Sequence, residues 1–247
     1  YLYYADRVYQ INLAIAGIAV GTVALPNLAK NVKLKKQNII DKLQNRSIEL
    51  CLLLSLPAAF GLLIASEQIV NSLFGYGSFN IKDIHYTSLA LIFFAFGVPA
   101  FALIKVLSNF YFARNDTKFP FYVSFITMLI NIIISLSFFK KYGFIIIPIA
   151  TSLSSWVAIL IYLIFLKKNK ILFLSSEFIS NFLKILLSTF LMSIFLYYGL
   201  NYFEDKFVYL NKFKLIYLLI MVGLSSALYL IVAKILGVLN LKSYKIK

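Results

Sequence analysis

Charged residues are scarce in this sequence, and their scarcity excludes a soluble globular protein. Only 13% of the 247 residues are charged, 62% are hydrophobic, and the mean hydropathy is +0.88. Soluble domains carry about 25% charged and about 45–50% apolar residues. A chain with about half the usual charge cannot keep so much apolar surface away from water, so the sequence predicts an integral membrane protein.

Reactive side chains are equally scarce, which narrows the chemistry. Cys51 is the single cysteine and His85 the single histidine, so neither an intrachain disulfide nor a zinc site of cysteine and histidine ligands can form. A serine–histidine–aspartate triad would need His85, which has no nucleophile motif beside it. We expect a protein that is not an enzyme and that needs no metal and no cofactor.

Acidic residues are also few, nine against 24 Lys and Arg, and the net charge is +15. In a soluble protein such an excess would suggest nucleic acid as a partner. Here the basic residues lie in short segments between long apolar runs, where anionic lipid headgroups and membrane topology explain them better. The expected partners are membrane lipids and not nucleic acid.

Long apolar runs are abundant, and about 20 such residues suffice to cross a bilayer as a helix. The sequence predicts an all-α polytopic membrane protein with seven transmembrane helices. Their expected bounds are residues 8–29, 50–66 (extending to about 73), 84–104, 119–139, 142–166, 178–198 and 215–236.

Basic residues are divided unequally between the two sides that these spans define. One side receives fourteen Lys and Arg, from residues 30–46, 108–118, 167–177 and the C-terminal tail, and the other receives seven. Because cytoplasmic loops carry the excess of basic residues, we expect the richer side and the C-terminus to be cytoplasmic. Residue 1 would then lie outside, so we also expect a fragment that lacks an odd number of preceding helices.

The segment 31–50 has apolar residues at near-helical spacing with basic residues between them. The apolar positions are Val32, Ile39, Ile40, Leu43 and Leu50. This pattern predicts a helix that lies in the cytoplasmic headgroup plane, and a solvated basic loop is the alternative.

Ionisable and polar side chains at or within a span mark candidate functional positions, because they are costly there. Asp6 and Arg7 lie at the outer end of the first span. Arg7 could face a central cavity and grip phosphate oxygens with Asp6 tuning it, or the pair could be an interfacial anchor among tyrosines. Asn131 and Thr151 lie at membrane depth, where such groups bond across helices more often than they supply oxygens to a cation.

Four motifs follow one another along the chain. The first reads Tyr4-Ala5-Asp6-Arg7, then Gly17-Ile18-Ala19-Val20-Gly21-Thr22 and Leu25-Pro26. The others read Leu73-Phe74-Gly75-Tyr76-Gly77, then Lys105-Val106-Leu107 with Phe110-Tyr111-Phe112-Ala113-Arg114-Asn115-Asp116-Thr117, and finally Ala150-Thr151-Ser152-Leu153. In this order and spacing they resemble the lipid II flippase family, called MurJ or MviN. The resemblance covers about residues 1–166, and the last two helices agree only in number and hydropathy.

The resemblance implies an architecture. Members of the family look like fourteen-helix transporters of the MATE/MOP type, with two six-helix lobes around a central cavity and two further helices that line a groove for a lipid tail. This chain would be the C-terminal half, helices 8–14, and its missing N-terminal half would be a partner. Residues 1–166 would hold most of the C-terminal lobe in five helices, and residues 167–247 the two additional helices and a cytoplasmic tail.

The resemblance also implies a function: translocation of the undecaprenyl-pyrophosphate-linked peptidoglycan precursor, lipid II, across the bacterial inner membrane by alternating access, for cell wall synthesis. Arg7 matches the family's cavity arginine, which is thought to meet the pyrophosphate, and Asp6 matches its neighbour. Asn131 and Thr151 resemble positions that help to hold a sodium ion in some members, but Ser135 stands where a carboxylate is expected. Coupling would come from a sodium ion or from the membrane potential.

Two alternatives stay open. A polysaccharide, O-antigen or multidrug exporter of the same superfamily would share the cationic cavity. From another class, a membrane glycosyltransferase could use Glu204 and Asp205 as acid and metal ligand, although the outer loop 199–214 is short for such an enzyme.

Overall fold

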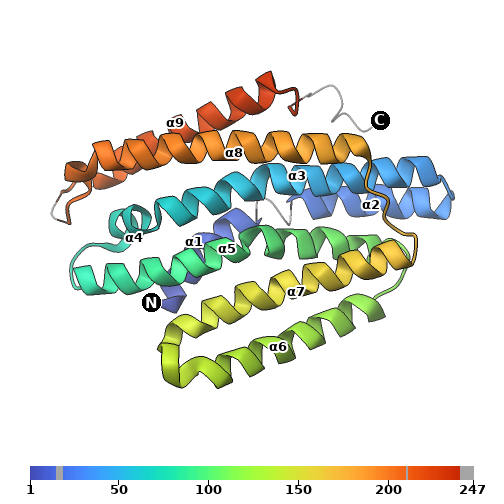
Figure 1. Ribbon diagram of the computed structural model, residues 1–247, viewed down its shortest axis with the longest axis horizontal. Helices are drawn as coiled ribbons and strands as arrows, with labels where there is room; N and C mark the ends of the chain where they lie inside the picture. The colour runs from blue at the N-terminus through green and yellow to red at the C-terminus, as the bar shows by residue number, and fades with distance from the viewer. Residues whose placement is uncertain (15–18, 210, 240–247) are drawn as a thin grey trace.

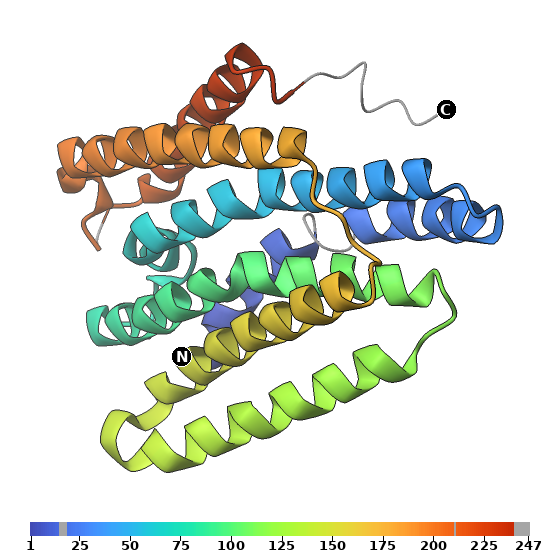
Figure 2. The ribbon, with the colours of Figure 1, turned by 45° about the vertical axis from the view of Figure 1, so that its right-hand side comes forward.

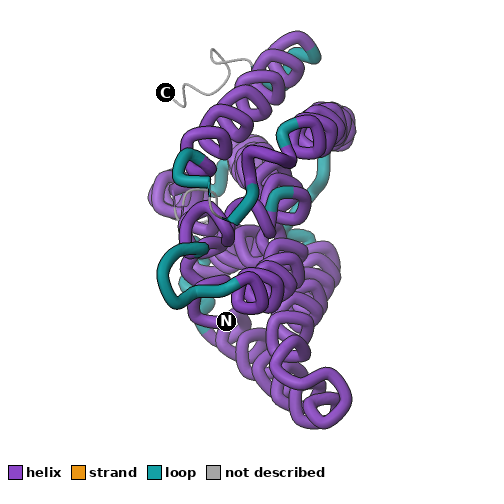
Figure 3. The backbone as a smooth tube through the Cα atoms, turned by 90° about the vertical axis from the view of Figure 1, so that its left-hand side faces the viewer, coloured by secondary structure: helices purple, strands orange, loops and turns teal. Residues whose placement is uncertain are grey.

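The computed structural model describes residues 1–14, 19–209 and 211–239, and within these ranges all regular structure is helical (Figure 3). The helices are α1 (Leu2–Leu13), α2 (Ala19–Lys33), α3 (Gln37–Ile64), α4 (Ser66–Phe74), α5 (Ile81–Phe112), α6 (Lys118–Tyr142), α7 (Ile146–Lys168), α8 (Ser176–Tyr202) and α9 (Lys214–Ile235). The short 3-10 helix η2 (Gly143–Ile145) joins α6 to α7, and η3 (Glu204–Phe207) lies between α8 and α9. The prediction of an all-helical fold is confirmed.

Five helical stretches are long and apolar enough to cross a membrane. They are Gln37–Ile64, Ile81–Phe112, Lys118–Lys168, Ser176–Tyr202 and Lys214–Ile235, and the third of them contains both α6 and α7. These stretches include the spans predicted from residue 84 onward and most of the one predicted at 50–66. The first predicted span, residues 8–29, includes residues 15–18, which lie outside the described ranges.

The prediction of one helix in the headgroup plane over 31–50 is wrong. α2 continues to Lys33, Lys35 turns the chain with a φ of 54°, and α3 then runs unbroken from Gln37 to Ile64. Two of the apolar residues of 37–50, Ile40 and Leu43, are buried against other helices, whereas Ile39 is exposed. An amphipathic pattern indicates one apolar surface beside the helix, and here that surface is protein rather than lipid headgroups.

The long helices lie side by side in an order that differs from the chain order. α8 packs on α3, α3 on α5, α5 on α7 and α7 on α6, and Figures 1 and 2 show these helices as successive layers. α1 packs on α5. α6 forms the edge of the arrangement, since only Pro120 and Val123 of its residues are buried.

The loops gather at two opposite ends. In Figure 1 the α2–α3 turn, the α5–α6 loop and the α7–α8 linker lie at one end, while the α4–α5 loop, η2 and the α8–α9 connection lie at the other. Three of the basic segments counted together above, 30–46, 108–118 and 167–177, therefore meet at one end. The fourth, the C-terminal tail, has its basic residues beyond residue 239, outside the described ranges.

Side-chain caps mark the first residues of two helices, one at each end of the molecule. Asn80 and Asp83 form a reciprocal capping box at the start of α5, with hydrogen bonds of 3.1 and 2.9 Å. The Ser175 hydroxyl accepts a 3.1 Å hydrogen bond from the Phe178 N–H and so caps α8. Each cap satisfies backbone donors that a helix start leaves without partners.

α5 and α7 approach each other closely at Gly97. The Ser152 hydroxyl of α7 donates a 2.6 Å hydrogen bond to the Phe93 carbonyl of α5, one turn before Gly97. A Cβ atom on Gly97 would lie 2.5 Å from the Ser152 Oγ and would also collide with the Phe101 ring. The glycine thus permits the contact between these helices.

We expect Gly97→Val to lower the free energy of unfolding by about 1–3 kcal/mol, the usual cost of overpacking. Gly61→Val is the matched control: Gly61 is also helical, but a Cβ there meets nothing within 4 Å. Thermal unfolding of both variants in detergent measures the difference. Equal melting temperatures for the two variants would contradict the close α5–α7 contact.

Candidate functional site

One face of α1 is fastened to α5. Val8 and Tyr9 are buried, and the Tyr9 ring stacks on Phe94 with 4.8 Å between ring centroids. At the start of the helix the Tyr1 hydroxyl donates a 3.1 Å hydrogen bond to Asp83, and this bond raises the pKa of the Tyr1 phenol. These contacts fix the rotation of α1 and therefore which of its residues face outward.

Arg7 lies on the opposite, open face of α1. Tyr3 and Ile11, one helical turn before and after Arg7, are 64% and 65% exposed, and Arg7 is exposed between them. The Arg7 guanidinium lies 4.9 Å from the centre of the Tyr3 ring, a cation–π contact. The half-buried Asp6 carboxylate accepts a hydrogen bond from Gln10. The guanidinium is thus held at an outward-facing position where an external anion can reach it.

The structure brings Asn131 and Thr151 together, as two hydrogen-bonded residues on adjacent helices. The Asn131 amide on α6 donates to the Thr151 hydroxyl on α7 at 3.0 Å, and Thr151 donates to the Ile147 carbonyl at 2.8 Å. The Ser135 hydroxyl donates to the Asn131 side-chain oxygen at 3.4 Å. These groups form a neutral network that joins α6 to α7, and it lies apart from Arg7, which is on α1.

A buried lysine, Lys214, begins α9, and the sequence did not predict a role for it. Lys214 is fully buried, and its ammonium donates hydrogen bonds to the Asn71 side-chain oxygen (2.9 Å), the Gly75 carbonyl (2.7 Å) and the Tyr209 carbonyl (3.0 Å). The Tyr76 and Tyr209 rings lie 4.2 and 5.1 Å from the same nitrogen. This Lys214 anchor joins α9 to the end of α4 and the loop that follows it.

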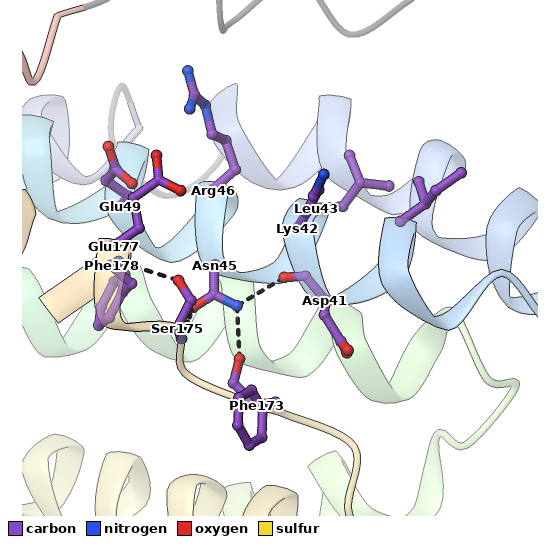
Figure 4. Close-up of a pocket in the computed structure, with 11 residues that line it drawn as sticks. Asp41, Lys42, Leu43, Asn45, Arg46, Glu49, Phe173, Ser175, Glu177 and Phe178 are labelled. Atoms are coloured by element: carbon purple, nitrogen blue, oxygen red, sulfur yellow. Dashed lines mark hydrogen bonds between the residues drawn. The ribbon is translucent and has the colours of Figure 1, made fainter.

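A corresponding Asn45 anchor lies at the start of α8 (Figure 4). The Asn45 amide donates to the Asp41 carbonyl at 2.8 Å and to the Phe173 carbonyl at 2.7 Å, and its oxygen accepts from the Ser175 N–H at 3.1 Å. The side chain thus holds the linker before α8 against α3. Hydropathy and charge counting do not signal this contact, because the linker residues that Asn45 binds, Phe173 and Ser175, lie about 130 residues away in the chain.

Glu204 and Asp205, the residues of the glycosyltransferase alternative, lie on η3 and are exposed. Across the described ranges there is no cluster of three or more His, Cys, Asp or Glu side chains that could hold a metal ion. Glu204 and Asp205 are thus an exposed acidic pair on a short turn, which does not favour the glycosyltransferase alternative.

Comparisons with known proteins point to one family. The sequence model of the family described as lipid II flippase MurJ matches residues 1–219. The probable lipid II flippase MurJ of Rickettsia prowazekii (strain Madrid E) is 34% identical over 244 residues, which cover 97% of this chain and 47% of that protein. The lipid II flippase MurJ of Thermosipho africanus (strain TCF52B) is 31% identical over 228 residues, covering 92% of this chain and 45% of that protein.

A solved structure agrees with these relatives. A lipid II flippase MurJ in an inward closed conformation superposes with a TM-score of 0.80 at 29% sequence identity, covering 95% of this chain and 46% of that one. The chain therefore spans about half the length of the proteins that it matches.

The contribution of the Lys214 anchor to stability can be measured by substitution. We expect Lys214→Met to lower the free energy of unfolding by about 1–3 kcal/mol, because the Asn71, Gly75 and Tyr209 oxygens lose their buried donor. Lys212→Met is the control, since Lys212 is exposed two residues earlier. Melting temperatures in detergent measure both, and a loss as large for Lys212→Met as for Lys214→Met would refute the anchor.

Proposed function

The chain belongs to the lipid II flippase MurJ family, and from this premise we propose that it takes part in moving lipid II, the undecaprenyl-pyrophosphate-linked peptidoglycan precursor, across the bacterial inner membrane. The chain spans about half the length of its relatives, so we propose the transport activity for the whole protein of which this chain is a part. The observation that carries it is the position of Arg7 on the open face of α1.

Arg7 has the chemistry that a pyrophosphate requires. A guanidinium presents a rigid fork of donors that binds phosphate oxygens in pairs, which a lysine ammonium cannot do. The Tyr3 ring supports the guanidinium without neutralising it. Asp6 is hydrogen-bonded to Gln10 and, as its neighbour in the chain, is proposed to tune the same site. Arg7 therefore remains available for the substrate headgroup.

The finer architecture also belongs to the proposal. We assign seven membrane-crossing segments to the chain, corresponding to helices 8–14 of a two-lobe MATE/MOP-type transporter. Residues 1–166 form most of the C-terminal lobe, and residues 167–247 form the two additional helices and a tail at the cytoplasmic side. The lobe works by alternating access with the other half of the protein, as inverted-repeat transporters do.

A related exporter is the second candidate function. A polysaccharide, O-antigen or multidrug exporter would use the same exposed cation on α1, so the site alone does not distinguish these substrates. The family match favours lipid II, and the rescue of cells that lack their own lipid II flippase separates the two.

We expect the complete gene that encodes this chain to rescue cells depleted of their lipid II flippase, and Arg7→Ala to abolish the rescue. Losing charged hydrogen bonds of about 1.5–3 kcal/mol weakens headgroup binding roughly 10- to 100-fold. Arg7→Lys should rescue partially, because it keeps the charge and loses the fork.

Lys234→Ala is the control for this experiment, since Lys234 is an exposed cation on α9, far from α1 in the chain. It should rescue fully at an equal amount of protein in the membrane. Full rescue by Arg7→Ala would remove Arg7 from the substrate site, and no rescue by the unmodified gene would remove the lipid II assignment itself.

The proposed cation site consists of Asn131 and Thr151, with Ser135 beside them. A sodium ion there would have to displace the hydrogen bonds that these groups make with one another, and it would meet neutral oxygens only. We assign weak sodium binding to the pair and the larger share of the driving energy to the membrane potential, about 2.3 kcal/mol per charge per 100 mV.

Replacing potassium by sodium at equal ionic strength should change the melting temperature of the protein by less than about 1 °C. Ser135→Asp supplies the missing carboxylate, and at ten times its Kd sodium would then stabilise the variant by about 1.4 kcal/mol, or a few degrees. Adding Asn131→Ala should cancel that gain. A sodium-specific shift of several degrees without any substitution would contradict weak binding.

A further inference from the structure

A pocket of about 430 Å³ opens at the end of the structure where the basic segments meet. Its walls come from the first half of α3 and from the linker and first turn of α8 (Figure 4). Ligand sites commonly have volumes of about 300–1,000 Å³, so a small headgroup fits. The lining residues are Ile39, Asp41, Lys42, Leu43, Asn45, Arg46, Glu49, Phe173, Ser175, Glu177 and Phe178.

The walls are fixed before any ligand arrives. The Asn45 anchor holds the linker against α3, and the Ser175 cap holds the first turn of α8. Deeper in the pocket, Glu49 is only 4% exposed and accepts a 3.1 Å hydrogen bond from Asn181 of α8. A site whose side chains are already positioned loses little conformational entropy on binding.

The pocket carries both signs of charge. Figure 4 shows the Glu49 and Glu177 carboxylates side by side, with Arg46 rising from the same side of α3. The two carboxylates repel each other, and Arg46 attracts Glu49. Lys42 lies exposed one turn before Arg46. A simple anion would meet the paired carboxylates and a simple cation would meet Arg46 and Lys42, so the pocket matches a ligand with both charges.

The rim of the pocket is apolar and outward-facing. Phe173 is 73% exposed and Ile39 is 42% exposed, although both border a charged site. Exposed apolar side chains beside lysines and arginines are typical of the interface between headgroups and acyl chains. A ligand that fills this pocket therefore presents a charged head to Glu49 and Arg46 and a hydrocarbon part to Phe173 and Ile39.

We propose that the pocket binds the zwitterionic headgroup of an aminophospholipid, phosphoethanolamine, in the leaflet at the basic end of the protein. The primary ammonium donates to the Glu49 and Glu177 carboxylates, and the phosphate is held by Arg46 and Lys42. The acyl chains extend over Phe173 and Ile39. The bound lipid then bridges α3 and the start of α8, next to the Asn45 anchor.

Native mass spectrometry of the protein, expressed from its complete gene and purified in detergent, tests this site. The probes are phosphatidylethanolamine, phosphatidylglycerol, phosphatidylcholine and free phosphoethanolamine, each added separately. We expect phosphatidylethanolamine to bind about tenfold more tightly than phosphatidylglycerol, which lacks the ammonium. Phosphatidylcholine should bind more weakly because its methylated ammonium cannot donate, and free phosphoethanolamine because it leaves the apolar rim unused.

Two variants assign the selectivity to the carboxylates. Glu177→Gln changes an exposed side chain and should reduce phosphatidylethanolamine binding about tenfold without affecting the fold. Glu49→Gln keeps an oxygen for Asn181 and should have a similar effect. Glu204→Gln, an exposed acid at the other end of the protein, is the control and should bind like the unmodified protein.

Three results would overturn the proposal. Equal binding of phosphatidylethanolamine and phosphatidylglycerol would mean non-selective lipid contact. Free phosphoethanolamine binding as tightly as the lipid would point to a soluble ligand instead. Unchanged selectivity in both Glu177→Gln and Glu49→Gln, with melting temperatures equal to that of the unmodified protein, would place the binding outside this pocket.

Discussion

Buried polar side chains fasten the last two helices to α3 and α4, and the arrangement of the described helices depends on these bonds. Lys214 holds one end and Asn45 holds the other. Between them, the Tyr229 hydroxyl donates a 2.7 Å hydrogen bond to the Leu53 carbonyl. In an apolar medium no water replaces such a partner, so each broken bond leaves a costly unsatisfied group. The α8–α9 pair is therefore tied to the helices before it at three levels.

The described helices have covered surfaces in the middle of the arrangement and open surfaces at its edges. α3 and α5 lie in the middle, covered on both sides, whereas α6 is buried only at Pro120 and Val123. On α1 the buried residues face α5 and the face with Arg7 is left uncovered. The proposed transport function would need such a division, because the interior must stay rigid while one face meets the substrate.

Much of the helical pattern could be predicted from the sequence, because hydropathy alone decides which segments can leave water. The contact between Asn131 and Thr151 agrees with the general tendency of polar groups at membrane depth to bond across helices. The surface helix over 31–50 was wrong because an amphipathic pattern does not state whether protein or headgroups cover its apolar face. The burial of Lys214 could not be predicted, because a lysine before an apolar span is usually a solvated loop residue. Its partners Asn71 and Gly75 come close to it only in the folded chain.

Acidic residues are concentrated in the pocket between α3 and α8. The chain has only nine Asp and Glu, and three of them, Asp41, Glu49 and Glu177, line one pocket at the end where Lys and Arg are concentrated. The basic segments around it attract anionic lipids by long-range charge, to any of many positions. Inside the pocket the paired carboxylates repel those same lipids and favour a primary ammonium. The proposed site would thus place an aminophospholipid at the junction of α3 and α8, apart from any anionic lipids that the basic surface attracts.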